Sequence, residues 1–241
     1  MIEKLRKIVQ PPSNVTNRRQ RKMLKRFVED FPEGSIIVDL GAGRMKTSDR
    51  VLSIDIYRAP GVDLLGDIEA MPFKTNSIDG IIARGVLEHV VDVDRVVSEI
   101  YRVLKPGGKV YSSIPFMQGY HPSPGDYRRF TIDGIQQLFK NFERVDCSIT
   151  RGTASSFVWI AREFFSEVFS FNNITLYKML KILFGWLLQP VKHLDWLTER
   201  HPKSHIIASS FTFIGEKPRA SSHDRGESAF EVNRHHSFVT T

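Results

Sequence analysis

The chain has 241 residues, 41% of them hydrophobic, and a single cysteine, Cys147. This length suits one domain with appended segments, and one cysteine excludes a disulfide framework or a cysteine-rich metal site. Of the net charge of +7, nearly all precedes residue 31, because residues 1–30 hold nine basic and three acidic residues. We therefore expect a local basic segment and not a basic active-site face. No continuous apolar run opens the chain, so we expect no signal peptide and a cytoplasmic setting.

Residues 1–30 are predicted to be a basic N-terminal helical segment. Asn17 can cap a helix that runs to about residue 30, since Met23, Leu24, Phe27 and Val28 recur at three- and four-residue spacing. Such a helix can meet nucleic acid or an anionic membrane, or it can pack with its basic face in solvent. The sequence FPEG at 31–34 then turns the chain toward a strand.

Residues 36–40 are an apolar run that contains an acid, Asp39, and breaks into the glycines Gly41 and Gly43. This pattern predicts a buried parallel strand that enters a ligand-binding turn, where a missing Cβ lets a ligand approach the backbone. A nicotinamide dinucleotide fits poorly. The third glycine of its fingerprint is replaced by Lys46, and the next acid, Asp55, follows Gly41 by fourteen residues instead of about twenty.

Further strands are predicted at 51–55, 62–67, 78–83 and 109–116. An amphipathic helix is expected over 92–104, ended by the sequence PGG at 106–108. The fourth strand leads into RGVLEH at 84–89, at the carboxyl end where open α/β sheets place ligands. Glu88 and His89 can face a substrate there, with a structural role for His89 as the alternative.

Five segments in this order resemble the class I S-adenosylmethionine-dependent methyltransferases: VDLGAG at 38–43, SIDI at 53–56, GDIEAMPF at 66–73, GVLEHV at 85–90 and LKPGG at 104–108. The resemblance covers residues 31–150 and a terminal strand near 205–217. It implies a domain over 31–217 with an α/β, Rossmann-like, doubly wound seven-stranded sheet. The implied strand order is 3-2-1-4-5-7-6, with the last strand antiparallel. The usual helix after the glycines must be very short or absent, because only residues 44–50 are available.

The resemblance implies S-adenosyl-L-methionine as the cofactor. Asp55 has the chemistry for the ribose diol, since one carboxylate can accept two hydrogen bonds. By resemblance, Asp67 lies near the adenine amino group with Ile68 against the ring. The alternative for Asp67 is a cap of the turn before Pro72. The full set of predicted cofactor-binding residues is Asp39, Gly41, Ala42, Gly43, Asp55, Ile56, Asp67, Ile68, Arg84 and Gly85.

The loop GYHPSPGDYRRFT at 119–131 contains two prolines, which make it rigid, and places four polar side chains within nine positions: His121, Asp126, Tyr127 and Arg129. It resembles a methyltransferase subgroup with a His-Pro-x-Pro-x-Asp-Tyr-x-Arg-Phe-Thr loop, many members of which look like enzymes of surface-glycan or lipid-linked glycan assembly. His121 and Asp126 are our candidate general bases, with Tyr127 and Arg129 as positioning groups. The alternative, compatible with the first, is an Asp126–Arg129 ion pair with Thr131 capping a helix over 132–140.

Residues 142–150 and 205–215 are predicted to be the last two strands, and residues 153–204 form an aromatic helical insertion between them. The wide apolar face at 174–191 is too short to span a bilayer, which takes about 20 residues. It can lie in a membrane interface, cover the substrate cleft, or pack on a second copy as a homodimer. Residues 218–241 read as a disordered tail, in which His235-His236 is a weak metal hint without partner ligands. We expect no metal.

The sequence therefore predicts a methyltransferase that O-methylates a small-molecule glycan or a lipid-linked glycan acceptor, in the cytoplasm or peripherally at the inner face of the membrane. One alternative is methylation of another small apolar molecule such as a quinone precursor. Another is a membrane-docking protein that keeps the fold without turnover. Nucleic acid is not the expected partner, because no Asn/Asp-Pro-Pro-Tyr motif is present and the basic segment is remote from the glycines in sequence.

Overall fold

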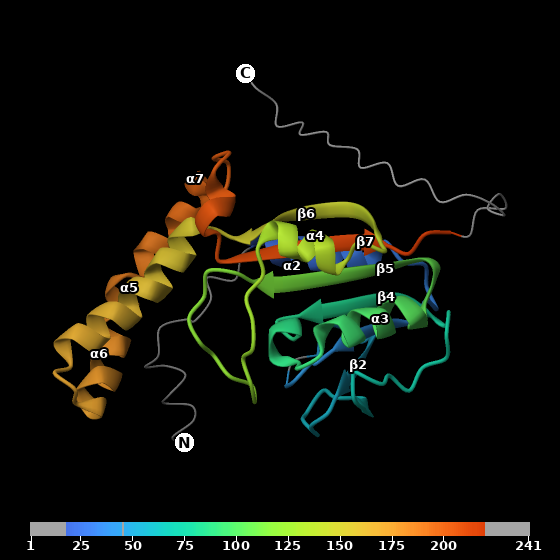
Figure 1. Ribbon diagram of the computed structural model, residues 1–241, viewed down its shortest axis with the longest axis horizontal. Coiled ribbons are helices and arrows are strands. Elements are labelled where there is room, and N and C mark those ends of the chain that lie inside the picture. Colours follow the sequence, from blue (N-terminus) through green and yellow to red (C-terminus); the bar gives the residue numbers. More distant parts are fainter. Residues whose placement is uncertain (1–17, 45, 220–241) are drawn as a thin grey trace.

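A seven-stranded sheet in the order β3-β2-β1-β4-β5-β7-β6 forms the centre of the computed structural model, which describes residues 18–44 and 46–219 (Figure 1). β7 runs antiparallel to both of its neighbours, and the other pairings are parallel. The predicted strand order and the antiparallel last strand are confirmed. The strands are β1 Ile37–Leu40, β2 Val51–Asp55, β3 Leu64–Leu65, β4 Ile78–Arg84, β5 Leu104–Pro115, β6 Glu143–Arg151 and β7 Ser210–Glu216.

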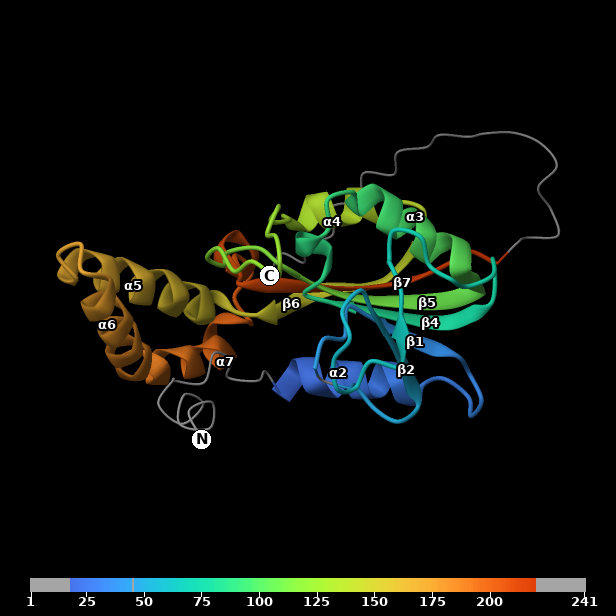
Figure 2. The same cartoon turned by 90° about the horizontal axis from the view of Figure 1, so that it is seen from below.

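Helices cover both faces of this sheet, which makes it a three-layer fold (Figure 2). α2 (Arg18–Glu29) packs Phe27 and Val28 against residues of β1, β2, β4 and β5. The opposite face is covered by α3 (Val93–Val103) and α4 (Ile132–Leu138), whose apolar side chains belong to the larger core cluster. The helix expected over 17–30 is thus confirmed as a packed helix, although its predicted cap Asn17 lies outside the described residues.

Several predicted boundaries were wrong. α3 ends at Val103. Leu104 is already the first residue of β5, where it pairs with Ile78 of β4. The glycines at 107–108 do not end the helix. They lie where the register shifts within β5, and Gly107 takes a φ of +81° while its N–H donates to the carbonyl of Lys217. β7 begins at Ser210 and not near residue 205, because Ser204–Ile207 form a 3-10 turn.

The described residues between Gly43 and Val51 form no helix, as the short spacing predicted. The described part of this segment runs as turns and irregular backbone from the carboxyl end of β1 to the start of β2. Since the sheet lacks a helix directly after β1, α2 is the helix that borders this edge (Figure 2).

The insertion between β6 and β7 is a helical hairpin of α5 (Thr153–Phe169) and α6 (Ile174–Leu187). It is followed by η2 (Gln189–Leu194), α7 (Asp195–Thr198) and η3 (Ser204–Ile207). Asp195 of α7 stabilises the start of α5 by accepting hydrogen bonds from the backbone N–H groups of Ala154 and Ser155. The hairpin points away from the sheet in both views, and no helix within 18–44 and 46–219 is long and apolar enough to cross a bilayer.

Candidate functional site

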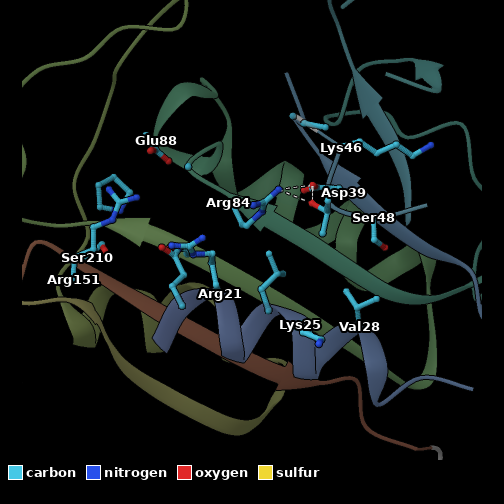
Figure 3. Close-up of a pocket in the computed structure, with 18 of the residues that line it drawn as sticks. Arg21, Lys25, Val28, Asp39, Lys46, Ser48, Arg84, Glu88, Arg151 and Ser210 are labelled. Atoms are coloured by element: carbon cyan, nitrogen blue, oxygen red, sulfur yellow. Dashed lines mark hydrogen bonds and ion pairs between the residues drawn. The ribbon is translucent and has the colours of Figure 1, made fainter. Parts of the chain in front are cut away.

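A cavity of about 1130 Å³ lies at the carboxyl ends of β1 and β4, between α2 and the loops that follow these strands (Figure 3). Eight of the residues predicted from sequence line it: Asp39, Gly41, Ala42, Arg84, Gly85, Glu88, His89 and His121. The other predicted residues are not among its lining residues: Gly43, Asp55, Ile56, Asp67, Ile68, Asp126, Tyr127 and Arg129. The cavity therefore joins the glycine turn to the loop after β5, while Asp55 and Asp67 lie beside it at the ends of β2 and just past β3.

Asp39 and Arg84 face each other in the cavity (Figure 3), and Thr47 also lines it. Its buried carboxylate accepts hydrogen bonds from Arg84 Nη2 at 2.7 Å and from Thr47 Oγ1 at 2.5 Å, and Arg84 Nη2 also donates to Thr47 Oγ1. Burial raises the pKa of Asp39, and the charge of Arg84 and the Thr47 hydroxyl oppose that rise. Thr47, which the sequence analysis missed, thus links the short 44–50 segment to β1 and β4.

The glycine turn brings its backbone to the carboxylate of Asp55. Gly41 and Gly43 take φ values of +63° and +58°, and a Cβ on Gly41 would lie 2.5 Å from Val86 Cγ2. A Cβ on Gly43 would meet no atom within 4 Å, so open space borders the turn there. Asp55 accepts the Gly43 N–H on Oδ2 and the Tyr57 N–H on Oδ1, each at 2.9 Å. Each oxygen keeps a second lone pair, which suits the two hydroxyls of a ribose.

Apolar side chains stand next to these acids. Ile56 is 62% exposed and Leu65 is 52% exposed, whereas Ile68 is buried. Asp67 accepts the backbone N–H of Glu69 on Oδ1, so the predicted capping role of Asp67 is confirmed. Its contact with an adenine amino group stays a prediction. A turn with two glycines at positive φ, open space beside Gly43, a ribose-type acid and exposed aliphatic side chains fits an adenosyl cofactor.

The loop at 119–131 is held together by Arg129, all five of whose N–H groups are engaged. Nη1 and Nη2 donate hydrogen bonds to the two carboxylate oxygens of Asp126 at 2.5 and 2.6 Å. The remaining N–H groups donate to the carbonyls of residues 118, 119 and 128. Arg129 is the main reason that the pKa of Asp126 falls to about 2. The predicted ion pair is thus confirmed, as is the Thr131 cap on the N–H of Gly134. The roles of Asp126, Tyr127 and Arg129 toward an acceptor stay predictions.

His121 is the loop residue that reaches the cavity, and it meets Glu88 and His89 there. Glu88 Oε1 lies 3.7 Å from Nε2 of each histidine, and the two rings are in edge contact. The Glu88 carboxylate is the main cause of a raised pKa at His121, and burial opposes it. Tyr127 is exposed, and its backbone N–H donates to the carbonyl of Glu88, which ties the two loops together.

Sequence reasoning missed several further cavity residues, among them Arg21 and Lys25 of α2, Arg151 at the end of β6, and Ser210 at the start of β7 (Figure 3). Burial lowers the pKa of the Arg151 guanidinium. The expectation that the basic segment lies apart from the site was therefore wrong. The signal was available in the helical spacing, because Arg21 and Lys25 flank Leu24 on the face adjacent to the packed one.

Comparison with known proteins gives matching results at three levels. Residues 38–112 match the family model described as a methyltransferase domain. Over 79 residues, 32% of each chain, the sequence is 35% identical to a demethylmenaquinone methyltransferase of Symbiobacterium thermophilum. The chain thus spans about a third of that relative's length.

Two solved structures share the fold. One is phosphoethanolamine N-methyltransferase 2 of Haemonchus contortus in complex with S-adenosyl-L-methionine, with a TM-score of 0.53, 18% identity, and coverage of 84% of this chain and 53% of that one. The other is a putative sarcosine dimethylglycine methyltransferase of Galdieria sulphuraria, with a TM-score of 0.53, 15% identity, and coverage of 83% and 86%. The sheet order and these matches confirm the class I methyltransferase fold, and S-adenosylmethionine is the cofactor that it indicates.

Proposed function

We propose that this chain, whose residues 38–112 form a methyltransferase domain on a class I S-adenosylmethionine-dependent methyltransferase fold, methylates a small-molecule acceptor bound in the cavity. The observation that carries this proposal is that one cavity contains both the glycine turn and His121. A methyl donor held at the turn and an acceptor held near the histidine would then share one enclosed space. Methyl transfer is an in-line displacement, which depends mainly on such alignment.

The donor side of the proposal rests on Asp55, the glycine turn and Arg84. S-adenosylmethionine supplies a methyl group on a sulfonium, which needs no activation by the protein. Asp55 would hold the ribose through the two lone pairs that its contacts with Gly43 and Tyr57 leave available. Asp39 would act indirectly, because it is buried and holds Arg84 in position at the cavity floor.

The acceptor side is polar and cationic, which supports a sugar or phosphate-bearing acceptor over a purely apolar one. Arg21, Lys25 and Arg151 line the cavity, and Lys25 is paired there with Glu29. Guanidinium and ammonium groups are the donors that bind phosphate oxygens and hydroxyls. His121, which lines the cavity, would accept the proton of a hydroxyl acceptor. O-methylation of a glycan or a lipid-linked glycan is therefore the preferred reaction.

The helical hairpin supports attachment to a membrane surface. Exposed apolar side chains form stripes at helical spacing along α5, with Phe157, Ile160 and Phe164, and along α6, with Met179 and Leu183. Stripes of this kind can bury in the headgroup region of a bilayer. A lipid-linked acceptor would then reach the cavity from the bilayer to which the hairpin is bound.

A membrane test uses vesicles with anionic or neutral headgroups. We expect co-sedimentation of the chain with anionic vesicles, and weaker binding after Phe157→Ser and Leu183→Ser. Val91→Ser and Val145→Ser remove exposed apolar side chains elsewhere and serve as matched controls. If the hairpin variants alter the oligomeric state and leave vesicle binding unchanged, the hairpin is an interface between two copies.

Methylation of a quinone precursor is the second candidate, favoured by the demethylmenaquinone methyltransferase among the relatives. An apolar acceptor would also arrive from the membrane, but it would use few of the cavity's cations. An assay with labelled methyl donor, on lipid extract and on water-soluble sugars separately, distinguishes these acceptors by the fraction that becomes labelled. No labelled product despite cofactor binding would favour the non-catalytic docking protein.

The decisive experiment for the cofactor is calorimetric titration with S-adenosylmethionine and S-adenosylhomocysteine. We expect binding by the wild type and loss of binding in Asp55→Ala. Asp94→Ala, which removes an exposed acid at the start of α3, is the matched control and should bind normally. Absence of binding in the wild type would refute the proposal.

A further inference from the structure

Glu88, His89 and His121 come together from two separate loops. Glu88 and His89 belong to η1 (Leu87–His89), directly after β4, and His121 belongs to the loop after β5. One oxygen or ring nitrogen from each residue lies within 4.8 Å of those of the other two. All three residues line the cavity, so the cluster faces the space where the acceptor is proposed to bind.

The hydrogen bonds fix which ring nitrogen of each histidine faces Glu88 with a lone pair. His89 Nδ1 lies 2.6 Å from the carbonyl oxygen of Gly125, which can only accept, so Nδ1 carries the hydrogen. His121 Nδ1 lies 2.8 Å from the carbonyl of Gly119. Arg129 Nη2 is 3.1 Å from the same nitrogen, but both of its hydrogens go to Asp126 and Gly119. In both neutral rings, Nε2 therefore presents a lone pair.

Three acceptor atoms thus converge without a hydrogen between them. The side chain of Glu88 is only 2% exposed, its Oε1 lies 3.7 Å from both Nε2 atoms, and its Oε2 has no hydrogen-bond partner in the described chain. A buried carboxylate in this state costs free energy, and protonating one ring would satisfy only one of the two contacts. A divalent cation at the centre would satisfy all three atoms together.

We propose that Glu88, His89 and His121 bind a divalent transition-metal ion, with Zn²⁺ as the reference metal. Two imidazoles and one carboxylate are a known ligand set for zinc sites that keep an open position. Histidines that bind metals usually donate the other ring N–H to a carbonyl or carboxylate, as both do here. Zn–N bonds of about 2.0–2.1 Å place tetrahedral ligands roughly 3.3 Å apart. Glu88 Oε1, at 3.7 Å from each Nε2, needs to approach by only a few tenths of an ångström, and the two Nε2 atoms, which lie within 4.8 Å of each other, need a side-chain adjustment of at most about 1.5 Å.

The open positions of this ion would face the cavity and bind an oxygen of the acceptor. This deepens the proposed function, because a metal-bound hydroxyl loses its proton to water more readily than a free one. His121 would then be a metal ligand, and the ion would replace it as the group that makes the hydroxyl oxygen nucleophilic. The sequence analysis expected no metal, because the three ligands occupy two loops more than thirty residues apart.

The test is calorimetric titration of the metal-stripped full-length chain with Zn²⁺, in the absence of any methyl donor. We expect one ion per chain and a loss of at least tenfold in affinity for each of Glu88→Gln, His89→Ala and His121→Ala. The double variant His235→Ala/His236→Ala, outside the described residues, is the control and should bind as the wild type does. Mg²⁺ should not compete, since imidazole is a poor magnesium ligand.

A second measurement needs no variant that could fail to fold. Co²⁺ added to the wild type should give the strong visible absorption of a four-coordinate ion, and Zn²⁺ should remove it. Zinc affinity that is unchanged in Glu88→Gln and His121→Ala, or lost in the control, would overturn the proposal. Because this binding is measured without cofactor, failure here leaves the methyltransferase proposal standing, and failure of the cofactor titration leaves the metal site standing.

Discussion

Replacing Arg129 tests whether the His121 loop is held by this one guanidinium. In Arg129→Ala, Asp126 loses both short ionic hydrogen bonds, and the carbonyls of residues 118, 119 and 128 each lose one donor. The carbonyl of residue 119 keeps its hydrogen bond from His121 Nδ1. Removing one member of a buried ion pair costs about 3–5 kcal/mol, and the 23% exposure of the Arg129 side chain favours the lower end. We expect the free energy of unfolding to fall by about 3 kcal/mol.

Urea unfolding followed by circular dichroism measures this change, and a double-mutant cycle with Asp126→Ala isolates the pair. The double variant should lose less than the sum of the two single variants, because the second substitution removes the charge that the first leaves unpaired. Arg128→Ala is the matched control. The Arg128 guanidinium donates a hydrogen bond to the Val91 carbonyl, and we expect its removal to lower the free energy of unfolding by less than about 1 kcal/mol. Additive losses at Asp126 and Arg129, or equal losses at Arg128 and Arg129, would refute this reasoning.

Three further outcomes follow from other side chains. Burial and the nearby Arg162 and Arg151 lower the pKa of Lys192 from 10.5 to about 8. Between about pH 8 and 10.5 the unfolded chain therefore binds more protons than the folded chain, so the free energy of unfolding of the wild type rises with pH in this range. Lys192→Met should remove that rise and be more stable than the wild type at pH 7 by up to about 3 kcal/mol, as pH-dependent urea melts would show. Burial raises the pKa of Cys147 to about 11, so native alkylation should quicken roughly tenfold per pH unit from pH 8 to 10, and a pH-independent rate would contradict this. Thr131→Ala removes the α4 cap and should cost about 1 kcal/mol, which Thr131→Ser should largely restore.

The strand order was predictable because each core strand has its own sequence signal. β1 and β4 are buried apolar runs, and each ends at the residues that face the cavity. The ends of the elements were less predictable, since they depend on partners distant in sequence. Leu104 reads as the last helical residue, yet it pairs with Ile78, and β3 shrinks to two residues at the exposed edge of the sheet.

The interactions of the site were predictable where both partners lie in one segment, and unpredictable where the partners come from separate segments. The sequence alone identified the Asp126–Arg129 pair, because the two residues are three positions apart in a rigid loop. The Asp39–Thr47–Arg84 group joins three segments, and only the fold shows that the hydroxyl of Thr47 reaches the carboxylate. The lone pairs of His89 and His121 depend on carbonyls whose directions no residue pattern encodes.

The described residues between Gly43 and Val51 form no helix, and a basic helix that precedes the first strand borders the site. A helix in that place would cover this part of the sheet edge, whereas the short 44–50 segment leaves α2 as the wall (Figure 3). α2 therefore contributes Arg21 and Lys25 to the same cavity as Gly41. The shortened turn and the basic segment, which look unrelated in sequence, therefore meet at one cavity. Under the function proposed above, Arg21 would then help to bind an anionic acceptor, whereas the charge of Lys25 is shared with Glu29.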